Sequence, residues 1–195
     1  MKTLKLVFIC LLLSTVSLAQ VPSPKDQIAA AVQTAPEDQQ AGAKVWGFDD
    51  AGKLIELRKG TNSMVCLADD PNKKGYNAAC YHKDMEEFMA RGRALRAEGK
   101  GRKEIFDIRE EEAKSGKLKM PEGGRALHIR FGKEGKYNSE SGIVENTNIR
   151  YVIYIPWATA ESSGLPLKPI VPGGPWIMDP GTHRAHIMVS PPKKD

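Results

Sequence analysis

The chain has 195 residues, of which 41% are hydrophobic and 27% charged, and its formal net charge is +5 at pH 7. These values are those of one ordinary domain that is long enough to bury its own core. The basic surplus is small and spread along the chain, and no nucleic-acid-binding module is recognisable, so the sequence excludes a nucleic acid as the expected partner.

The first nineteen residues have the layout of a secretory signal peptide. A basic start precedes an apolar run over residues 6–13, and a small-x-small cleavage site ends at Ala19. The apolar run is too short to span a bilayer, and no later segment is suited to do so. We therefore expect residues 1–19 to be removed, and the mature chain to begin at Gln20, to work in the periplasm or outside the cell, and to contain no integral membrane segment.

The segment from residue 20 to residue 42 is expected to be a flexible N-terminal arm. It contains three prolines and many glutamines and alanines, and only residues 25–34 have the pattern of a short helix. Such terminal segments are often loosely attached. The remaining residues, 43–195, are expected to fold as a single α+β domain.

Two cysteines remain after removal of the signal peptide, Cys66 and Cys80. Two cysteines in an oxidising compartment usually form a disulfide. The segment between them is polar and rich in turn formers, and closing this loop of about 15 residues would contribute roughly 3 kcal/mol in the chain-entropy model. Free or redox-active thiols and a metal site completed by His82 remain as alternatives. No cofactor is predicted.

Apolar and polar residues alternate in several short segments that are bounded by turn formers, which predicts strands. The predicted strands are residues 44–49, 53–58, 63–68, 125–131, 148–156 and 185–190. The first two form a hairpin around an Asp-Ala-Gly turn. The strand over 148–156 is apolar on both faces, so we expect it to lie inside the sheet with both faces covered and Ile153 buried.

Two helices are predicted between these strands. Asp84 and Glu87 have the spacing of a capping box, and apolar residues follow on one helical face up to Leu95. Residues 103–114 predict a second, more charged helix at the surface. The order of elements favours an α+β fold with a mainly antiparallel sheet, in which two helices lie between an N-terminal hairpin and C-terminal strands.

The densest basic stretch of the chain is residues 91–103. We interpret it as a solvated helical face and loop, because charge runs on helices usually face water. A patch for an anionic partner is the alternative.

The long loop from Trp157 to Pro175, with its flanks, is the expected binding site. A loop of this length in a compact domain is usually functional or disordered, and this one carries apolar side chains that are costly to leave in water. Polar groups gather at both of its ends. The residues predicted to bind a ligand are Trp157, Glu161, Trp176, Asp179, His183 and His186.

His183 and His186 also raise the possibility of a metal or proton-transfer site. A third ligand would have to come from Asp179, His128 or Glu161. Pro-Gly precedes the two histidines and a strand pattern follows them, so we expect them to point in different directions. No catalytic residue and no metal ligand is assigned, because the chain has neither a nucleophile elbow nor a zinc-binding His-Glu-x-x-His motif.

Residues 60–67, with the sequence GTNSMVCL, and the following Cys80 resemble a Gly-Thr-Asn-x-x-x-Cys-Leu pattern in small exported bacterial proteins of uncharacterised function. Those proteins end with a Trp, a Gly-x-His and a short apolar strand, to which Trp176, residues 181–183 and residues 186–189 are similar. The resemblance implies export and a single domain, and it implies no activity.

The sequence as a whole predicts a secreted or periplasmic binding domain that is braced by one disulfide and to which no catalysis is assigned. Its expected partner is an unidentified small molecule or a protein of the cell envelope. One alternative is a metal-dependent hydrolase that uses His183, His186 and a carboxylate, and another is a purely structural component of the envelope.

Overall fold

The computed structural model describes residues 21–192, so the predicted signal peptide lies outside the described residues. The strands are β1 (Lys44–Phe48), β2 (Leu54–Arg58), β3 (Met64–Leu67), β4 (Tyr76–His82), β5 (Arg125–Gly132), β6 (Lys136–Asn138), β7 (Ile143–Glu145), β8 (Asn148–Tyr154), β9 (Trp176–Met178) and β10 (His186–Val189). The helices are α1 (Pro24–Val32), α2 (Glu37–Gln40), α3 (Glu86–Ala97), α4 (Arg102–Lys114) and α5 (Ala160–Ser163), with a 3₁₀ turn, η1 (Lys83–Met85), before α3.

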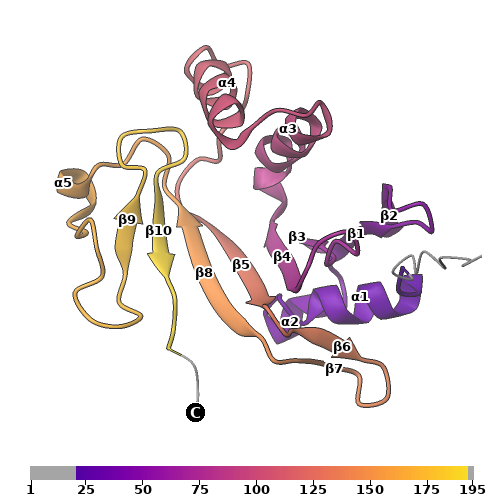
Figure 1. The fold of residues 1–195 in the computed structure, drawn as a ribbon. Helices are drawn as coiled ribbons and strands as arrows, with labels where there is room; N and C mark the ends of the chain where they lie inside the picture. The colour runs from indigo at the N-terminus through magenta and orange to yellow at the C-terminus, as the bar shows by residue number, and fades with distance from the viewer. Residues whose placement is uncertain (1–20, 193–195) are drawn as a thin grey trace, which may run out of the picture.

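These elements form the predicted α+β fold with a mainly antiparallel sheet (Figure 1). Eight strands pair in the order β2-β1-β3-β4-β5-β8-β10-β9, and β6 and β7 form a separate two-stranded sheet. Only the pair of β1 and β3 is parallel within the large sheet. Within residues 21–192, no helix has the length and apolar character needed to cross a membrane.

The main core lies between the sheet and α3. One row of side chains crosses five strands in register and is buried along its whole length; it consists of Val65, Tyr81, Leu127, Val152 and Met188. Met85 and Phe88 pack on this row from η1 and α3. Met85 and Phe88 lie on the same face of this segment, as the spacing of its apolar residues predicts.

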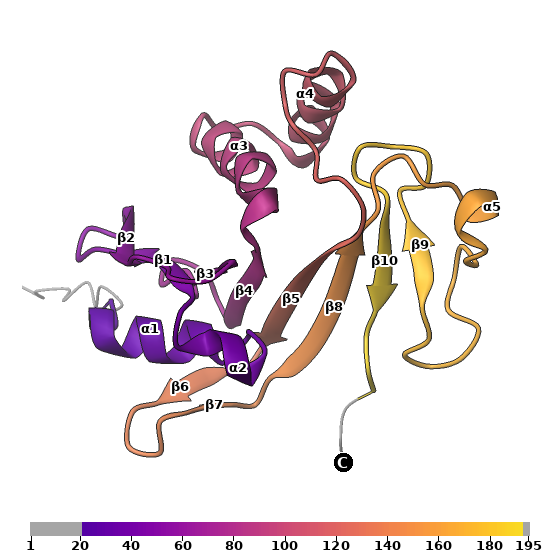
Figure 2. The same ribbon diagram turned by 180° about the vertical axis from the view of Figure 1, so that it is seen from behind.

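The N-terminal segment differs from the expected flexible arm, because α1 and α2 pack on the opposite face of the sheet (Figure 2). Ser23 caps α1 by accepting a hydrogen bond from the backbone of Asp26. Ala31 and Ala35 are buried against Val45 and the two cysteines. Small side chains let the helix approach the sheet closely, so a segment that looks weakly hydrophobic in the sequence still buries a continuous face.

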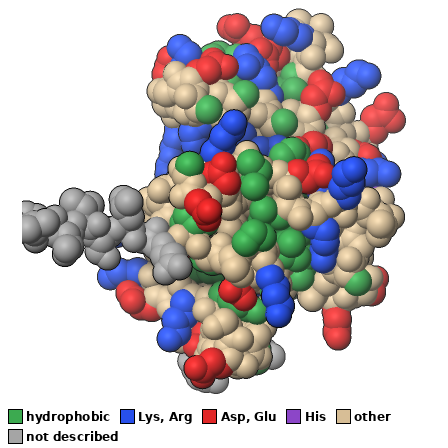
Figure 3. Space-filling model, turned by 90° about the vertical axis from the view of Figure 1, so that its right-hand side faces the viewer, with side chains coloured by type: hydrophobic (Ala, Val, Ile, Leu, Met, Phe, Trp, Pro, Cys, Tyr) green, Lys and Arg blue, Asp and Glu red, His purple; other side chains and the backbone are tan. Residues whose placement is uncertain are grey.

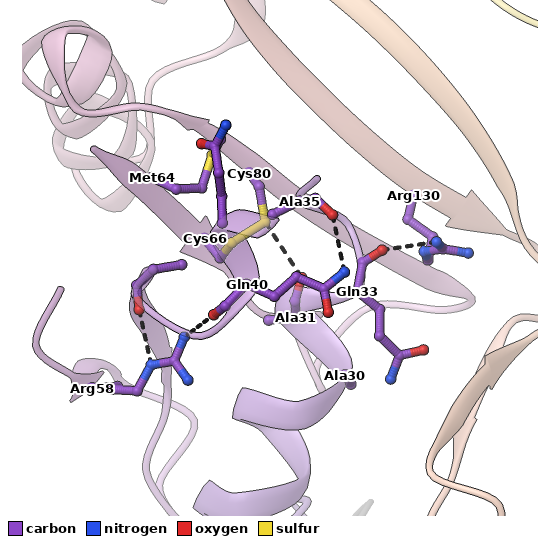
Figure 4. The surroundings of a disulfide bond; sticks show 12 residues. Ala30, Ala31, Gln33, Ala35, Gln40, Arg58, Met64, Cys66, Cys80 and Arg130 are labelled. Carbon is purple, nitrogen blue, oxygen red and sulfur yellow. Dashed lines mark hydrogen bonds between the residues drawn. A yellow bond between two sulfur atoms is a disulfide. The ribbon is translucent and has the colours of Figure 1, made fainter. Parts of the chain in front are cut away.

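Cys66 and Cys80 are joined by a disulfide, as predicted. They lie directly opposite one another on β3 and β4, with their Cα atoms 4.0 Å apart. Helix α1 covers the bond, and the Sγ atom of Cys80 lies 3.4 Å from the carbonyl oxygen of Ala31 (Figure 4). Nearby, Arg58 of β2 donates a hydrogen bond to the carbonyl of Gln40. The disulfide therefore braces the half of the sheet on which the N-terminal helices rest.

Strand β8 lies inside the sheet, as expected, but only one of its faces is covered. Val152 and Tyr154 are buried on the side of α3, whereas Tyr151 and Ile153 are only half-buried on the other side. Helix α1 contacts β1 to β4 and does not extend over β8. The expectation that Ile153 is almost fully buried is therefore wrong.

The edge of the sheet formed by β1 and β2 leaves apolar side chains partly accessible. Trp46, Phe48 and Leu54 are half-buried there. On this side of the molecule hydrophobic side chains gather in a patch surrounded by charged ones (Figure 3). The Nζ atom of Lys44 and the guanidinium of Arg93 lie 4.4 and 5.9 Å from the ring centre of Trp46. Long basic side chains thus shield part of this apolar surface from water.

Candidate functional site

The turn between β9 and β10, residues 179–185, is held against a second turn, residues 155–158, in which Ala158 donates to the carbonyl of Ile155. The backbone N–H of Trp157 donates to the carbonyl of Thr182 at 2.8 Å. Trp157 and Asp179 both have positive φ values, 68° and 50°, which residues other than glycine rarely adopt. Such strain persists only where the surroundings impose it, and it concentrates at functional sites.

His183 fastens this turn to the helices. Its side chain is 0% exposed, and the carboxylate of Glu110 on α4 accepts hydrogen bonds from both its backbone N–H and its ring Nδ1. The rings of Phe88 and Phe106 enclose the imidazole, with centroid distances of 5.8 and 5.0 Å. The Nε2 atom has no hydrogen-bond partner within residues 21–192. His183 thus joins the turn to both α3 and α4.

The charge states of this pair follow from its surroundings. Burial opposes ionisation of Glu110, but hydrogen bonds from Lys114 and His183 outweigh it and lower the pKa of Glu110 to about 2. Burial lowers the pKa of His183, and the nearby Arg109 and Arg184 add to this effect against the opposing influence of Glu110. At neutral pH the carboxylate is therefore ionised and the imidazole neutral, with its Nδ1–H donated to Glu110.

We expect the free energy of unfolding to fall as the pH is lowered from 7.5 to 5. Burial lowers the pKa of His183, and likewise the pKa of His186 and of His128. The unfolded chain therefore takes up protons near pH 6.5 that the folded chain does not bind, so the stability contributed by these groups is complete above that pH and is lost below it. Urea unfolding at the two pH values measures the change, and an equal free energy at both would contradict it.

A basic groove of about 750 Å³ lies beside the His183–Glu110 pair, between α4 and the 179–185 turn. Its lining residues are Arg96, Arg102, Lys103, Ile105, Phe106, Asp107, Arg109, Asp179 and Arg184. Lys103 pairs with Asp107 at 2.6 Å, and Arg184 pairs with Asp179 at 2.7 Å. The other three cations form no ion pair with any carboxylate in the part of the chain that the structure describes. The groove therefore carries positive charge that nothing in it neutralises.

Arg109 is the one of these three cations that is buried, whereas Arg96 and Arg102 are exposed. It is 8% exposed, its guanidinium lies 4.0 Å from the ring centre of Phe88, and its Nη1 donates to the Phe88 carbonyl at 3.2 Å. Its Nε–H is buried without a hydrogen-bond partner. Burial, together with the charges of Arg184 and Arg96, lowers the pKa of Arg109 to about 10, so it stays charged at neutral pH. A buried cation without a carboxylate partner is costly, and an anion in the groove would offset that cost.

The structure brings part of the predicted ligand set to this place. Asp179 lines the groove, His183 lies behind it, and the Nδ1 atom of His186 lies 2.7 Å from the carbonyl oxygen of Arg184. Of the six predicted residues only Asp179 lines the groove, and three of the others lie away from it. Trp157 lines a separate hollow, Glu161 is exposed on α5, and Trp176 packs against the main core.

The residues of this candidate site that the sequence interpretation did not include are on α3 and α4. Arg96 and Arg102 belong to the basic stretch 91–103, for which an anionic partner was the alternative interpretation, and Arg109 and Glu110 follow on α4. The signal available in the sequence was the density of basic residues. What it lacked was any indication that one side of this stretch faces the 179–185 turn rather than open solvent.

The spacing of His183 and His186 is not accompanied by a metal-ligand set in the described residues. Within 21–192, no three side chains of His, Cys, Asp or Glu are grouped so that they would hold a metal ion. The two Nδ1 atoms face Glu110 and the carbonyl of Arg184. No observation at this site therefore favours the metal-dependent hydrolase.

Comparison with known proteins identifies no relative. No protein-family model matches the chain, and no curated protein and no solved structure matches it. The resemblance of residues 60–67 to small exported bacterial proteins stays a prediction, and the function has to be argued from the groove.

Proposed function

We propose that this protein is an exported, non-catalytic binding domain that holds a small anionic ligand in the basic groove. The observation that carries the proposal is Arg109, a buried cation without a carboxylate partner at the groove wall. A guanidinium presents a planar fork of N–H donors that matches the oxygens of a carboxylate or a phosphate. We infer that the ligand supplies such oxygens.

The dimensions and the lining of the groove support a small ligand. Its volume of about 750 Å³ lies within the range of small-molecule sites. Ile105 and Phe106 provide apolar contact beside the cations. Because Asp107 neutralises Lys103 and Asp179 neutralises Arg184, the cations left for an anion are Arg96, Arg102 and Arg109.

Binding fits this groove better than catalysis does. His183 is enclosed by Phe88 and Phe106 and has no access to solvent. The two aspartates of the groove are held in ion pairs with Lys103 and Arg184, and the lining includes no histidine, cysteine or serine. Export is supported by the disulfide, which is typical of proteins outside the cytoplasm.

Isothermal titration with inorganic phosphate and with citrate tests the proposal. We expect saturable binding of at least one of these anions to the wild-type protein, and we expect Arg109→Met to weaken it about tenfold or more, since a charge-assisted hydrogen bond contributes roughly 1.5–3 kcal/mol. Methionine retains the packing on Phe88 while it removes the charge.

Arg150→Met is the matched control. Arg150 also lies over a phenylalanine ring, 4.7 Å from the centre of Phe131, and it donates to Ser190 at 3.0 Å. It does not line the groove, so its replacement should leave anion binding unchanged. Equal binding by the wild type and Arg109→Met, or no binding of either anion by the wild type, would refute the proposed function.

A further inference from the structure

The loop between α5 and β9 exposes a continuous apolar tip. Residues 167–172 are all exposed, and they include Leu167, Ile170 and Val171, whose exposed fractions are 58%, 84% and 59%. Large aliphatic side chains elsewhere in the described chain are mostly buried or half-buried. A run of this kind at a loop tip indicates a surface that contacts something apolar.

Prolines and backbone hydrogen bonds restrict the conformation of the loop, so that its tip stays exposed. Four prolines occur between residues 166 and 175. A hydrogen bond from the backbone N–H of Ile177 to the carbonyl of Pro166, at 3.0 Å, closes the base of the loop, and Gly174 donates to the carbonyl of Val171 at 2.9 Å. A preorganised tip loses little conformational entropy when it binds.

The charge around the tip favours an anionic lipid surface. Residues 162–178 contain no Asp or Glu and a single cation, the exposed Lys168. Exposed aliphatic side chains beside a basic residue, with no acidic residue near them in the sequence, suit the interface of a bilayer that contains anionic lipids.

The shape of the tip also suits a bilayer. A projecting loop can insert into a lipid interface that has no fixed contour, whereas a protein partner would need a matching pocket. The loop lies at the end of the molecule away from α4 (Figures 1 and 2). A protein attached by this loop would therefore leave the basic groove open to solvent.

We propose that residues 166–172 dock the protein on a membrane surface by inserting Leu167, Ile170 and Val171 among anionic lipids. This inference does not depend on the ligand of the groove. It adds to the proposed function that the protein works at the surface of a membrane of the cell envelope.

Co-sedimentation of the mature protein with vesicles tests the docking. Two vesicle types are used, phosphatidylcholine alone and a 7:3 mixture with phosphatidylglycerol. We expect the wild type to pellet with the mixed vesicles, and the double variant Ile170→Ser/Val171→Ser to lose about nine-tenths of that binding, because two of the three aliphatic anchors are gone. Lys168→Ser should weaken binding to the mixed vesicles only.

Ile143→Ser is the matched control, because Ile143 is 55% exposed but lies on β7, away from the loop. It should pellet like the wild type, and so should Arg109→Met.

Absence of wild-type binding to both vesicle types, or equal binding by the double variant, would overturn the proposal. So would a wild-type dimer in gel filtration that the double variant abolishes without vesicle binding, because the tip would then serve a protein contact. Loss of vesicle binding in Arg109→Met alone would place the lipid contact in the groove instead.

Discussion

Replacing Cys66 and Cys80 together by alanine is expected to lower the free energy of unfolding by about 3 kcal/mol. The bond closes a segment with a sequence separation of 14 residues, and a loop of that size contributes about this amount in the chain-entropy model. The enclosed segment includes a polar, turn-rich stretch before β4, so little else restrains it in the unfolded chain. Both cysteines are fully buried, and alanine avoids placing a hydroxyl in the apolar cluster beneath α1.

Urea unfolding with and without reductant measures this effect. Under reducing conditions the wild-type protein should approach the stability of the double variant, while the variant itself should not respond to reductant. Two free thiols in the mass spectrum of the exported protein, or a variant as stable as the oxidised wild type, would contradict the pairing.

Glu110→Ala is expected to cost about 3 kcal/mol of unfolding free energy. Among residues 21–192, the carboxylate of Glu110 is the only hydrogen-bond acceptor for His183, for its backbone N–H and for its ring Nδ1. Its removal leaves these two N–H groups of the buried His183 without a partner, and the cost of their desolvation is then not offset. Because His183 fastens the 179–185 turn to α4, the groove should loosen as well.

Two variants on the same helix calibrate this loss. Glu110→Gln keeps one acceptor oxygen, so it should cost about half as much as the alanine variant. Glu111→Ala changes an exposed neighbour on α4 and should change the stability by no more than about 0.5 kcal/mol. If thermal or urea unfolding shows Glu110→Ala to be no worse than Glu111→Ala, the His183–Glu110 pair does not stabilise the turn.

The sequence predicted most of the sheet because its strands alternate in polarity between clear turn formers. The hairpin of β1 and β2 and strand β5 follow this pattern, and β8 is visible as an apolar run. The strands β6, β7 and β9 have three residues each, which is too short for a period of two to be visible. Strand β4 was not predicted, because it follows directly on the polar, turn-rich stretch after Cys66. The packing of helix α1 on the sheet was not predicted, because alanines contribute little to a hydrophobic pattern. Their small size is nevertheless what allows the helix to pack closely on β1, β3 and β4.

The site was only partly predictable for a different reason. The turn that carries Asp179 and His183 is visible as a polar cluster after the long loop. Arg109 and Glu110 have no local signal, because a charged helix has the same sequence whether it faces water or a groove. Trp176 was assigned to ligand binding from its place beside the loop, but it starts β9 and packs on the core, a contact that only the register of β9 with β10 reveals.

The most direct test of the anion-binding groove is the stability of Arg109→Met with and without phosphate. If the positive charge of Arg109 is compensated only when an anion is bound, its replacement should leave the phosphate-free protein as stable as the wild type or more stable. The reason is that an uncompensated buried charge has been removed. Phosphate should then raise the melting temperature of the wild type and leave that of the variant unchanged. The opposite result would be a variant that is less stable than the wild type by more than about 1 kcal/mol without phosphate and that responds to phosphate as the wild type does. Arg109 would then be a structural residue, and the groove would hold no anion through it.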